Sequence, residues 1–193
     1  MKVAIIKYNS GNVQSVAFAL ERLGVVPILT DNAEELGSAD KVIFPGVGEA
    51  SSAMAYLKEQ KLDKVIVDLK QPVLGICLGM QLMCNSSEEG NTNCLGIFDQ
   101  KVLKFSSENK VPQIGWNKIS NFKSMLFDNV KENEYMYFVH GYYVENGLNT
   151  IATTNYGIEY SSSLQKDNFY GVQFHPEKSS EAGQLILQNF LAL

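Results

Sequence analysis

One cysteine of the chain lies in a sequence context that is typical of a catalytic nucleophile. Cys77 belongs to the segment Gly75-Ile76-Cys77-Leu78-Gly79, which follows an apolar run and precedes a helical pattern. A sharp strand-to-helix turn needs small residues two positions before and after the nucleophile, because strand and helix come close together. The turn places the side chain at the carboxyl end of a sheet and at a helix N-terminus, which favours a thiolate. The alternative is that Cys77 is a small buried hydrophobe, as most free cysteines are.

The other two cysteines lack such a turn. Cys84 lies seven residues further along the same predicted helix and Cys94 lies in a polar loop, so we interpret both as structural or incidental. Three cysteines are an odd number, which argues against a disulfide framework. With only two histidines in the chain, a zinc site has few ligands to draw on.

A cysteine nucleophile needs an imidazole and a group that orients it. His175 ends an apolar strand and is followed by Pro176 and Glu177. The residue before a proline favours an extended conformation, in which side chains two positions apart point to the same side. The pattern therefore predicts the Glu177 carboxylate beside the His175 imidazole. His140 is the only other histidine; it ends an apolar strand with no acidic residue within two positions, and we interpret it as a strand-end histidine with a satisfied hydrogen bond. The alternative is that His140 lies near the active site.

Cleavage of an amide also requires fixed N–H donors for the developing oxyanion. The backbone amide of Leu78, next to the nucleophile, is one candidate donor. The segment Pro45-Gly46-Val47-Gly48 ends another predicted strand, and its glycines allow the backbone to turn an N–H towards the same edge of the sheet. The alternative for this segment is a plain strand-to-loop turn.

These residues must be positioned by a sheet in the first half of the chain. Short apolar runs at residues 3–6, 25–29, 41–44 and 72–76 alternate with segments of helical spacing. Strands separated by helices predict βαβ units, and hence an α/β fold with a mostly parallel central sheet flanked by helices.

The second half has a different character. From about Val102 onward, short aromatic segments rich in β-formers are separated by turn residues, which predicts added antiparallel strands. Residues 179–193 predict a closing helix with one apolar face. Because no repeat or low-complexity linker interrupts the pattern, we expect a single domain over residues 1–193.

Composition and charge exclude several classes of function. The 193 residues carry a net charge of −5 and include one arginine, Arg22. A mildly acidic chain with one arginine is a poor candidate for binding nucleic acid or an anionic membrane. It contains no run of about 18 apolar residues, and its N-terminal apolar core of four residues is too short for a signal peptide. We therefore expect a cytoplasmic protein.

Together the motifs resemble the class I (triad-type) glutamine amidotransferases over residues 3 to 191. Three segments carry the resemblance, with Cys, His and Glu in the family's order: Gly75-Ile76-Cys77-Leu78-Gly79-Met80-Gln81, Gln173-Phe174-His175-Pro176-Glu177 and Pro45-Gly46-Val47-Gly48. Within the family, the chain is most similar to the glutaminase subunits of imidazole glycerol phosphate synthase. That finer resemblance is carried by Gly11-Asn12 with Ser15-Val16, Ile114-Gly115-Trp116-Asn117 and the Lys178-Ser179 extension.

The resemblance implies hydrolysis of L-glutamine to glutamate and ammonia through a cysteinyl thioester. Cys77 would attack the side-chain amide, His175 would transfer the proton and Glu177 would orient His175. The backbone N–H groups of Val47 and Leu78 would form the oxyanion hole. No metal or organic cofactor is implied.

The resemblance also implies a substrate pocket and a partner. Gly48, Gln81 and Tyr142 would lie around the glutamine. The ammonia would pass to a (β/α)8-barrel cyclase subunit of a heterodimer, which makes imidazole glycerol phosphate in histidine biosynthesis. The candidate residues for that interface are Asn12, Ile114, Trp116 and Lys178. For Trp116, the only tryptophan, the alternative is an ordinary core aromatic.

The chain departs from the branch pattern outside the triad, and other functions stay open. The departures are Lys7, Asn9, Ser10, Gln113, Ile114 and Gly141. They leave the predicted chemistry intact but leave the coupling to a partner open. The alternatives are a glutaminase subunit that feeds a different synthase, a non-catalytic interaction subunit, and another Cys–His–Glu hydrolase such as a peptidase.

Overall fold

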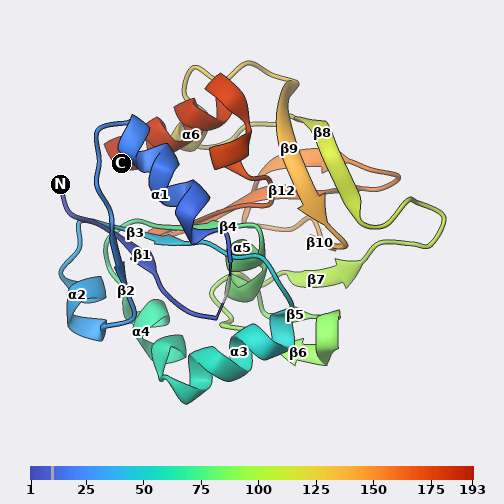
Figure 1. The fold of residues 1–193 in the computed structure, drawn as a ribbon. Helices are drawn as coiled ribbons and strands as arrows, with labels where there is room; N and C mark the ends of the chain where they lie inside the picture. The colour runs from blue at the N-terminus through green and yellow to red at the C-terminus, as the bar shows by residue number, and fades with distance from the viewer. Residues whose placement is uncertain (10) are drawn as a thin grey trace.

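A long mixed sheet forms the centre of the computed structural model, which describes residues 1–9 and 11–193; Ser10 lies outside the described residues (Figure 1). The strand order is β2-β1-β3-β4-β13-β12-β10-β7-β5-β6, with β11 paired to β12, while β8 and β9 form a separate two-stranded sheet. The strands are β1 (Val3–Ile6), β2 (Ile28–Thr30), β3 (Lys41–Phe44), β4 (Val73–Ile76), β5 (Ser86–Ser87), β6 (Thr92–Asn93), β7 (Lys101–Lys104), β8 (Gln113–Ile119), β9 (Glu134–His140), β10 (Tyr142–Val144), β11 (Thr150–Asn155), β12 (Glu159–Lys166) and β13 (Phe169–Val172).

Helices cover both faces of the parallel part of this sheet. In Figure 1, α1 and α6 lie on one side and α2, α3 and α4 on the other. The α-helices are α1 (Val13–Arg22), α2 (Ala33–Gly37), α3 (Ala50–Glu59), α4 (Leu62–Asp68), α5 (Leu78–Met83) and α6 (Ser180–Ala192), and the 3-10 turns are η1 (Glu89–Asn91), η2 (Met125–Phe127) and η3 (Pro176–Lys178). The expected α/β fold, with a mostly parallel core and added antiparallel strands, is confirmed.

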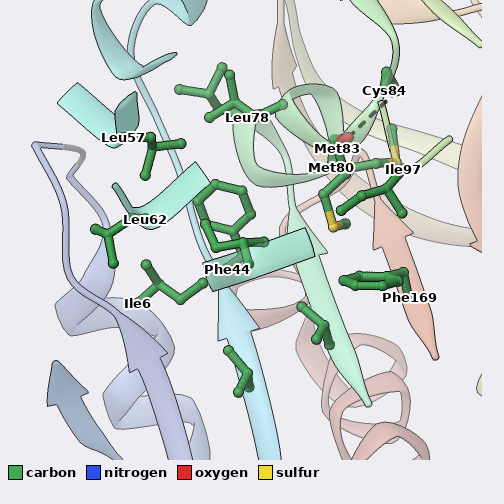
Figure 2. Packing of buried hydrophobic residues seen from close by; sticks show 14 of the residues in the cluster. Ile6, Phe44, Leu57, Leu62, Leu78, Met80, Met83, Cys84, Ile97 and Phe169 are labelled. Carbon is green, nitrogen blue, oxygen red and sulfur yellow. Dashed lines mark hydrogen bonds between the residues drawn. The ribbon is translucent and has the colours of Figure 1, made fainter. Parts of the chain in front are cut away.

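The apolar residues of the central strands divide between two core clusters. In β1, Ala4 and Ile6 pack in the cluster that contains α2 to α5, whereas Val3 and Ile5 pack in the cluster that contains α1 and α6. This alternation is what the pleat of a strand buried on both faces produces. Figure 2 shows the first cluster, in which the Phe44 side chain lies beside β3 and β4.

Two strands of the second half differ from the expectation of antiparallel pairing. β7 is antiparallel to β10 but parallel to β5. β13 is antiparallel to β12 but parallel to β4, with Val172 opposite Ile76. The hairpin formed by β12 and β13 returns the chain to the middle of the sheet in the direction of β4. The carboxyl ends of β4 and β13 therefore lie side by side, and the Cys77 N–H donates to the Val172 carbonyl at 2.8 Å.

Four of the α-helices and β-strands were not predicted from the sequence: α2, β5, β6 and β8. β5 and β6 have two residues each, too few for a strand pattern to show. α2 has five residues, too few for a helical period to show. β8 alternates exposed and more buried side chains and contains Gly115, which weakens the strand pattern. In the part of the chain that the structure describes, no helix has the length and apolarity needed to cross a membrane.

Candidate active site

Cys77 occupies a sharp turn between β4 and α5. Its φ of +53° and ψ of −110° lie in a region that residues with a side chain seldom adopt. A Cβ atom added to Gly75 would lie 2.8 Å from the Met80 nitrogen, and one added to Gly79 would lie 2.9 Å from the Phe44 carbonyl carbon. The two glycines are therefore required by close backbone approach, as the sequence pattern predicts.

The helix behind Cys77 is short and ends before Cys84, which we expected to lie on it. α5 contains six residues, fewer than two turns. Few peptide dipoles are aligned in so short a helix, so its N-terminus contributes less to thiolate stability than the sequence pattern predicts. The side chains around the sulfur therefore carry more of that stabilisation.

His175 and Glu177 lie together beside Cys77. His175 Nδ1 lies 2.8 Å from Glu177 Oε1, and both side chains are buried. The predicted pairing of His175 with Glu177 is present, but the backbone conformation differs from the prediction. His175 is extended, and the chain then forms the 3-10 turn η3 instead of continuing as a strand. The His175 N–H donates to the Tyr137 carbonyl at 2.9 Å, and the Ser179 hydroxyl donates to the His175 carbonyl at 2.7 Å. These two hydrogen bonds fix the backbone of His175 and so hold its imidazole in position.

The electrostatics favour a protonated imidazole beside the sulfur. Burial lowers the pKa of His175, but the charge of the Cys77 sulfur, its hydrogen bond to the imidazole, and Glu177 outweigh burial and raise the pKa above its ordinary value. An imidazolium between a thiolate and a carboxylate is the charge arrangement that a cysteine nucleophile needs.

Asn12, which we expected at a partner interface, contacts this pair. Its side-chain amide donates to Glu177 Oε1 and lies 3.3 Å from His175 Nδ1. Asn12 has a left-handed φ of +70° just before α1, a conformation that asparagine tolerates well. The contact does not test the predicted interface role, but it adds a second group, besides His175, that holds the Glu177 carboxylate.

Beside the triad, Cys77 opens onto a cavity of about 170 Å³. Its walls include the residues expected around the substrate and oxyanion together with four residues to which the sequence analysis gave no such role. The lining residues are Val47, Gly48, Cys77, Leu78, Gln81, Glu89, Val139, His140, Gly141 and Tyr142. These four are Val139, His140, Gly141 and Glu89, and Glu89 is the sole acidic residue in this lining.

The predicted oxyanion donors are not both directed at this cavity. The Leu78 N–H donates to the Gly46 carbonyl at 3.3 Å, so in this conformation the donor is already occupied. Val47 lines the cavity and is 37% exposed. An oxyanion hole built from these two amides requires the 45–48 segment to shift, and it stays a prediction.

His140 is a strand-end histidine with satisfied hydrogen bonds, as predicted, although it also reaches the cavity. Its Nδ1 donates to the Tyr142 carbonyl at 2.6 Å, so its Nε2 accepts from the Tyr160 hydroxyl at 3.2 Å; that hydroxyl also lies 3.0 Å from the side-chain amide of Gln113. Burial lowers the pKa of His140 to about 4. The imidazole is therefore neutral at physiological pH and is a poor general base.

This buried histidine predicts a loss of stability in acid. Between pH 4 and about 6.5 the unfolded chain binds a proton at His140 that the folded chain does not, so the free energy of unfolding decreases as the pH falls through this range. From pH 7 to pH 4 the loss from this group is about 3 kcal/mol. Urea unfolding of the wild type and of His140→Gln at both pH values measures it. We expect a smaller loss in the variant, and equal losses would contradict the assignment.

The other predicted interface residues lie outside the cavity. Ile114 is 63% exposed and Trp116 is 52% exposed, so Trp116 is not the core aromatic that we considered as an alternative. Lys178 is exposed as well. Ile114, Trp116 and Lys178 are therefore accessible to a protein partner, and their role at an interface stays a prediction.

Cys84 and Cys94 lack the surroundings that Cys77 has, since neither lines the cavity beside the triad. The Cys84 thiol is buried in the core cluster of Figure 2, where it donates to the Met80 carbonyl, and burial raises its pKa well above the ordinary value. Burial also raises the pKa of Cys94 to about 11. Neither thiol is suited to act as a nucleophile near neutral pH. Within residues 1–9 and 11–193, no group of three or more His, Cys, Asp or Glu side chains could hold a metal ion.

The chain matches known proteins over nearly its whole length. The family model described as glutamine amidotransferase class-I matches residues 4–193. The chain belongs to the class-I glutamine amidotransferases. This amidotransferase is 58% identical over 196 residues to the imidazole glycerol phosphate synthase subunit HisH of Bacteroides fragilis strain YCH46, with 100% of both chains covered. It is 45% identical to the HisH subunit of Haemophilus influenzae strain KW20, over 99% of this chain and 97% of that one.

A solved structure described as a glutamine amidotransferase has the same fold as this amidotransferase. The TM-score is 0.78 at 16% identity, with 100% of this chain and 98% of the other covered. At this identity the likeness concerns the fold alone. The family resemblance inferred from the sequence motifs is confirmed by the family match and by the curated relatives.

Proposed function

We propose that the chain is the glutaminase subunit of an imidazole glycerol phosphate synthase, which hydrolyses L-glutamine to glutamate and ammonia for histidine biosynthesis. The observation that carries the proposal is the buried His175–Glu177 pair beside the sulfur of Cys77, at the wall of a cavity. The HisH names of relatives that match the whole chain support the pathway.

The first half of the proposed reaction forms a thioester. The Cys77 thiolate attacks the side-chain carbonyl carbon of glutamine, and the C–N bond breaks as the His175 imidazolium donates its proton to the leaving nitrogen. The products of this half are ammonia, a γ-glutamyl thioester on Cys77 and a neutral imidazole. Glu177, held by Asn12, keeps the imidazole in place throughout.

The second half regenerates the enzyme. Neutral His175 removes a proton from water, whose oxygen attacks the thioester carbonyl. The C–S bond breaks, glutamate leaves, and the thiolate–imidazolium pair is restored. Both halves pass through an oxyanion, for which we propose the backbone N–H groups of Val47 and Leu78 as donors.

Glu89 is proposed to bind the α-ammonium group of glutamine. Its carboxylate lines the cavity, where Oε2 accepts a hydrogen bond from the Ala50 N–H at 2.8 Å, and burial raises its pKa. Replacing Glu89 by glutamine keeps an acceptor for Ala50 but removes the charge. We expect the KM for glutamine to rise about tenfold with little change in kcat.

Steady-state glutaminase assays with the partner cyclase measure this effect. The matched control is Glu88→Gln, because Glu88 accepts from the Lys104 N–H at 2.7 Å and is absent from the cavity lining. Equal KM values for wild type and Glu89→Gln would remove Glu89 from the substrate site.

The partner is proposed to be a (β/α)8-barrel cyclase subunit in a heterodimer. The chain has one arginine, so it is poorly equipped to bind a phosphorylated intermediate itself. The exposed Trp116 and Ile114 offer apolar anchors for a protein partner. The polar candidates are Lys178, which follows Glu177 in the chain, and Asn12, whose amide contacts Glu177. We place the reaction in the cytoplasm, whose reducing conditions keep a nucleophilic thiol free.

The isolated chain is expected to be a poor glutaminase. The hydrogen bond from Leu78 N–H to the Gly46 carbonyl occupies a proposed oxyanion donor and supports this expectation. The test is glutamate release from L-glutamine by the chain alone and by the chain with the cyclase and its nucleotide substrate. Strong activation supports the proposal, whereas equal turnover would overturn the role of the partner. Preference for γ-glutamyl peptides over glutamine would instead indicate a peptidase.

A further inference from the structure

Gln173 is a buried side chain that contacts the nucleophile and that the mechanism above does not use. It follows β13 directly and is fully buried, and its Nε2 donates to Cys77 Sγ at 3.6 Å. Its backbone N–H donates to the Ser162 carbonyl at 2.8 Å, so the residue is held by the sheet. The parallel pairing of β13 with β4 is what brings it beside the sulfur.

The surrounding hydrogen bonds fix which end of the Gln173 amide faces the sulfur. The Tyr142 carbonyl can only accept, so Gln81 must present its NH2 group there, at 3.1 Å. The same Gln81 nitrogen lies 2.9 Å from Gln173 Oε1. If the Gln173 amide were flipped, its NH2 group would face the NH2 group of Gln81, two donors. If both amides were flipped, the Gln81 side-chain oxygen would face the Tyr142 carbonyl, two acceptors. The NH2 group of Gln173 therefore points at Cys77.

Other groups at the sulfur favour the neutral thiol or contribute little. The Val139 carbonyl lies 3.7 Å from Sγ, where it can accept from S–H but repels a thiolate. The six-residue helix α5 supplies only a small dipole. Apart from His175, Gln173 is the side-chain donor that the described residues direct at this atom.

We propose that Gln173 is a thiolate-stabilising residue, whose side-chain N–H holds Cys77 in the anionic form that attacks the substrate. The inference rests on the proposed function only in taking Cys77 as the nucleophile. Gln81 acts through Gln173 as a positioning residue that sets the direction of this amide.

The test is the pH dependence of Cys77 alkylation by iodoacetamide in the full chain, with labelling of each cysteine followed by peptide mass spectrometry. In Gln173→Met and Gln173→Leu, which lack the donor but differ in shape, we expect the pH of half-maximal rate to rise by about one unit. The rate below neutral pH should fall about tenfold, a factor that corresponds to about 1.4 kcal/mol and lies near what a hydrogen bond to a charged group contributes.

The matched control is Gln100→Met, which makes the same change at a buried glutamine outside the cavity. It should react as the wild type does. Thermal melting identifies the variants that are folded. Folded Gln173 variants with an unchanged half-maximal pH would overturn the inference. A wild-type Cys77 no more reactive at pH 7 than Cys94 would instead refute the proposed function.

A second measurement needs no change at position 173. In NMR spectra of the wild-type chain, the side-chain NH2 resonances of Gln173 should shift with pH at the same midpoint as Cys77 alkylation, and Cys77→Ser should abolish that shift. If the Gln173 NH2 resonances did not shift with the ionisation of Cys77, the proposed hydrogen bond would be contradicted, even if the Gln173 variants did not fold.

Discussion

Replacing Cys77 by serine is expected to lower glutaminase activity by at least about 10⁴-fold in the presence of the partner cyclase. A serine hydroxyl is far less acidic than a thiol, so it stays neutral beside His175 and attacks an amide slowly. The change is small in volume and leaves Gly75 and Gly79 in place, so the turn should survive. Glutamate release at saturating glutamine, with circular dichroism to check folding, measures the loss.

The control for this prediction is Cys94→Ser, which makes the same substitution at a partly buried thiol that does not line the cavity. Its activity should stay within about twofold of the wild type, since substitutions outside special features change stability little. A Cys77→Ser enzyme that retained a tenth of the wild-type activity would mean that another group attacks the substrate.

Replacing Gly79 by alanine is expected to cost about 3 kcal/mol or more of stability. The added methyl group would lie 2.9 Å from the Phe44 carbonyl carbon and closer still to its oxygen, and both atoms are backbone. α5 must therefore move away from the end of β3, which also displaces Cys77. Urea unfolding would show the loss, and activity should fall with it.

Gly37→Ala is the matched control because Gly37 lies in α2 with nothing within 4 Å of an added Cβ. There the substitution should be neutral or stabilising by up to about 1 kcal/mol, since alanine favours the helix over glycine. If Gly79→Ala were as stable as Gly37→Ala, close packing of α5 on β3 would not be what holds the turn.

Local sequence was sufficient to predict the elements that carry Cys77 and His175. Gly75 and Gly79 are needed because strand and helix come close together at Cys77, and residues next to one another in the chain show this. The order His175-Pro176-Glu177 likewise places the imidazole and the carboxylate two residues apart. Both patterns depend on residues close together in the chain, so a single sequence is enough to predict them. The segments around Asn12, Trp116 and Lys178 also predicted the histidine branch, and the HisH names of the curated relatives agree with that prediction.

What sequence reasoning missed depends on contacts between distant segments. Glu89 lies in a polar loop beside Glu88, and nothing in the sequence distinguishes the acid that reaches the cavity from the one that does not. Gln173 contacts Cys77 only because β13 pairs parallel to β4, which we did not predict. Asn12 reaches Glu177 from the opposite end of the chain. Tertiary pairing decides each of these contacts.

The most direct test of the central claim is covalent labelling of the chain, complexed with its cyclase, by an electrophilic analogue of glutamine. The account predicts one adduct, on Cys77, that forms together with the loss of glutaminase activity and is prevented by excess L-glutamine. It also predicts slower labelling in His175→Ala. An active complex in which Cys77 stays unmodified while activity is lost through labelling elsewhere would contradict the assignment of the nucleophile.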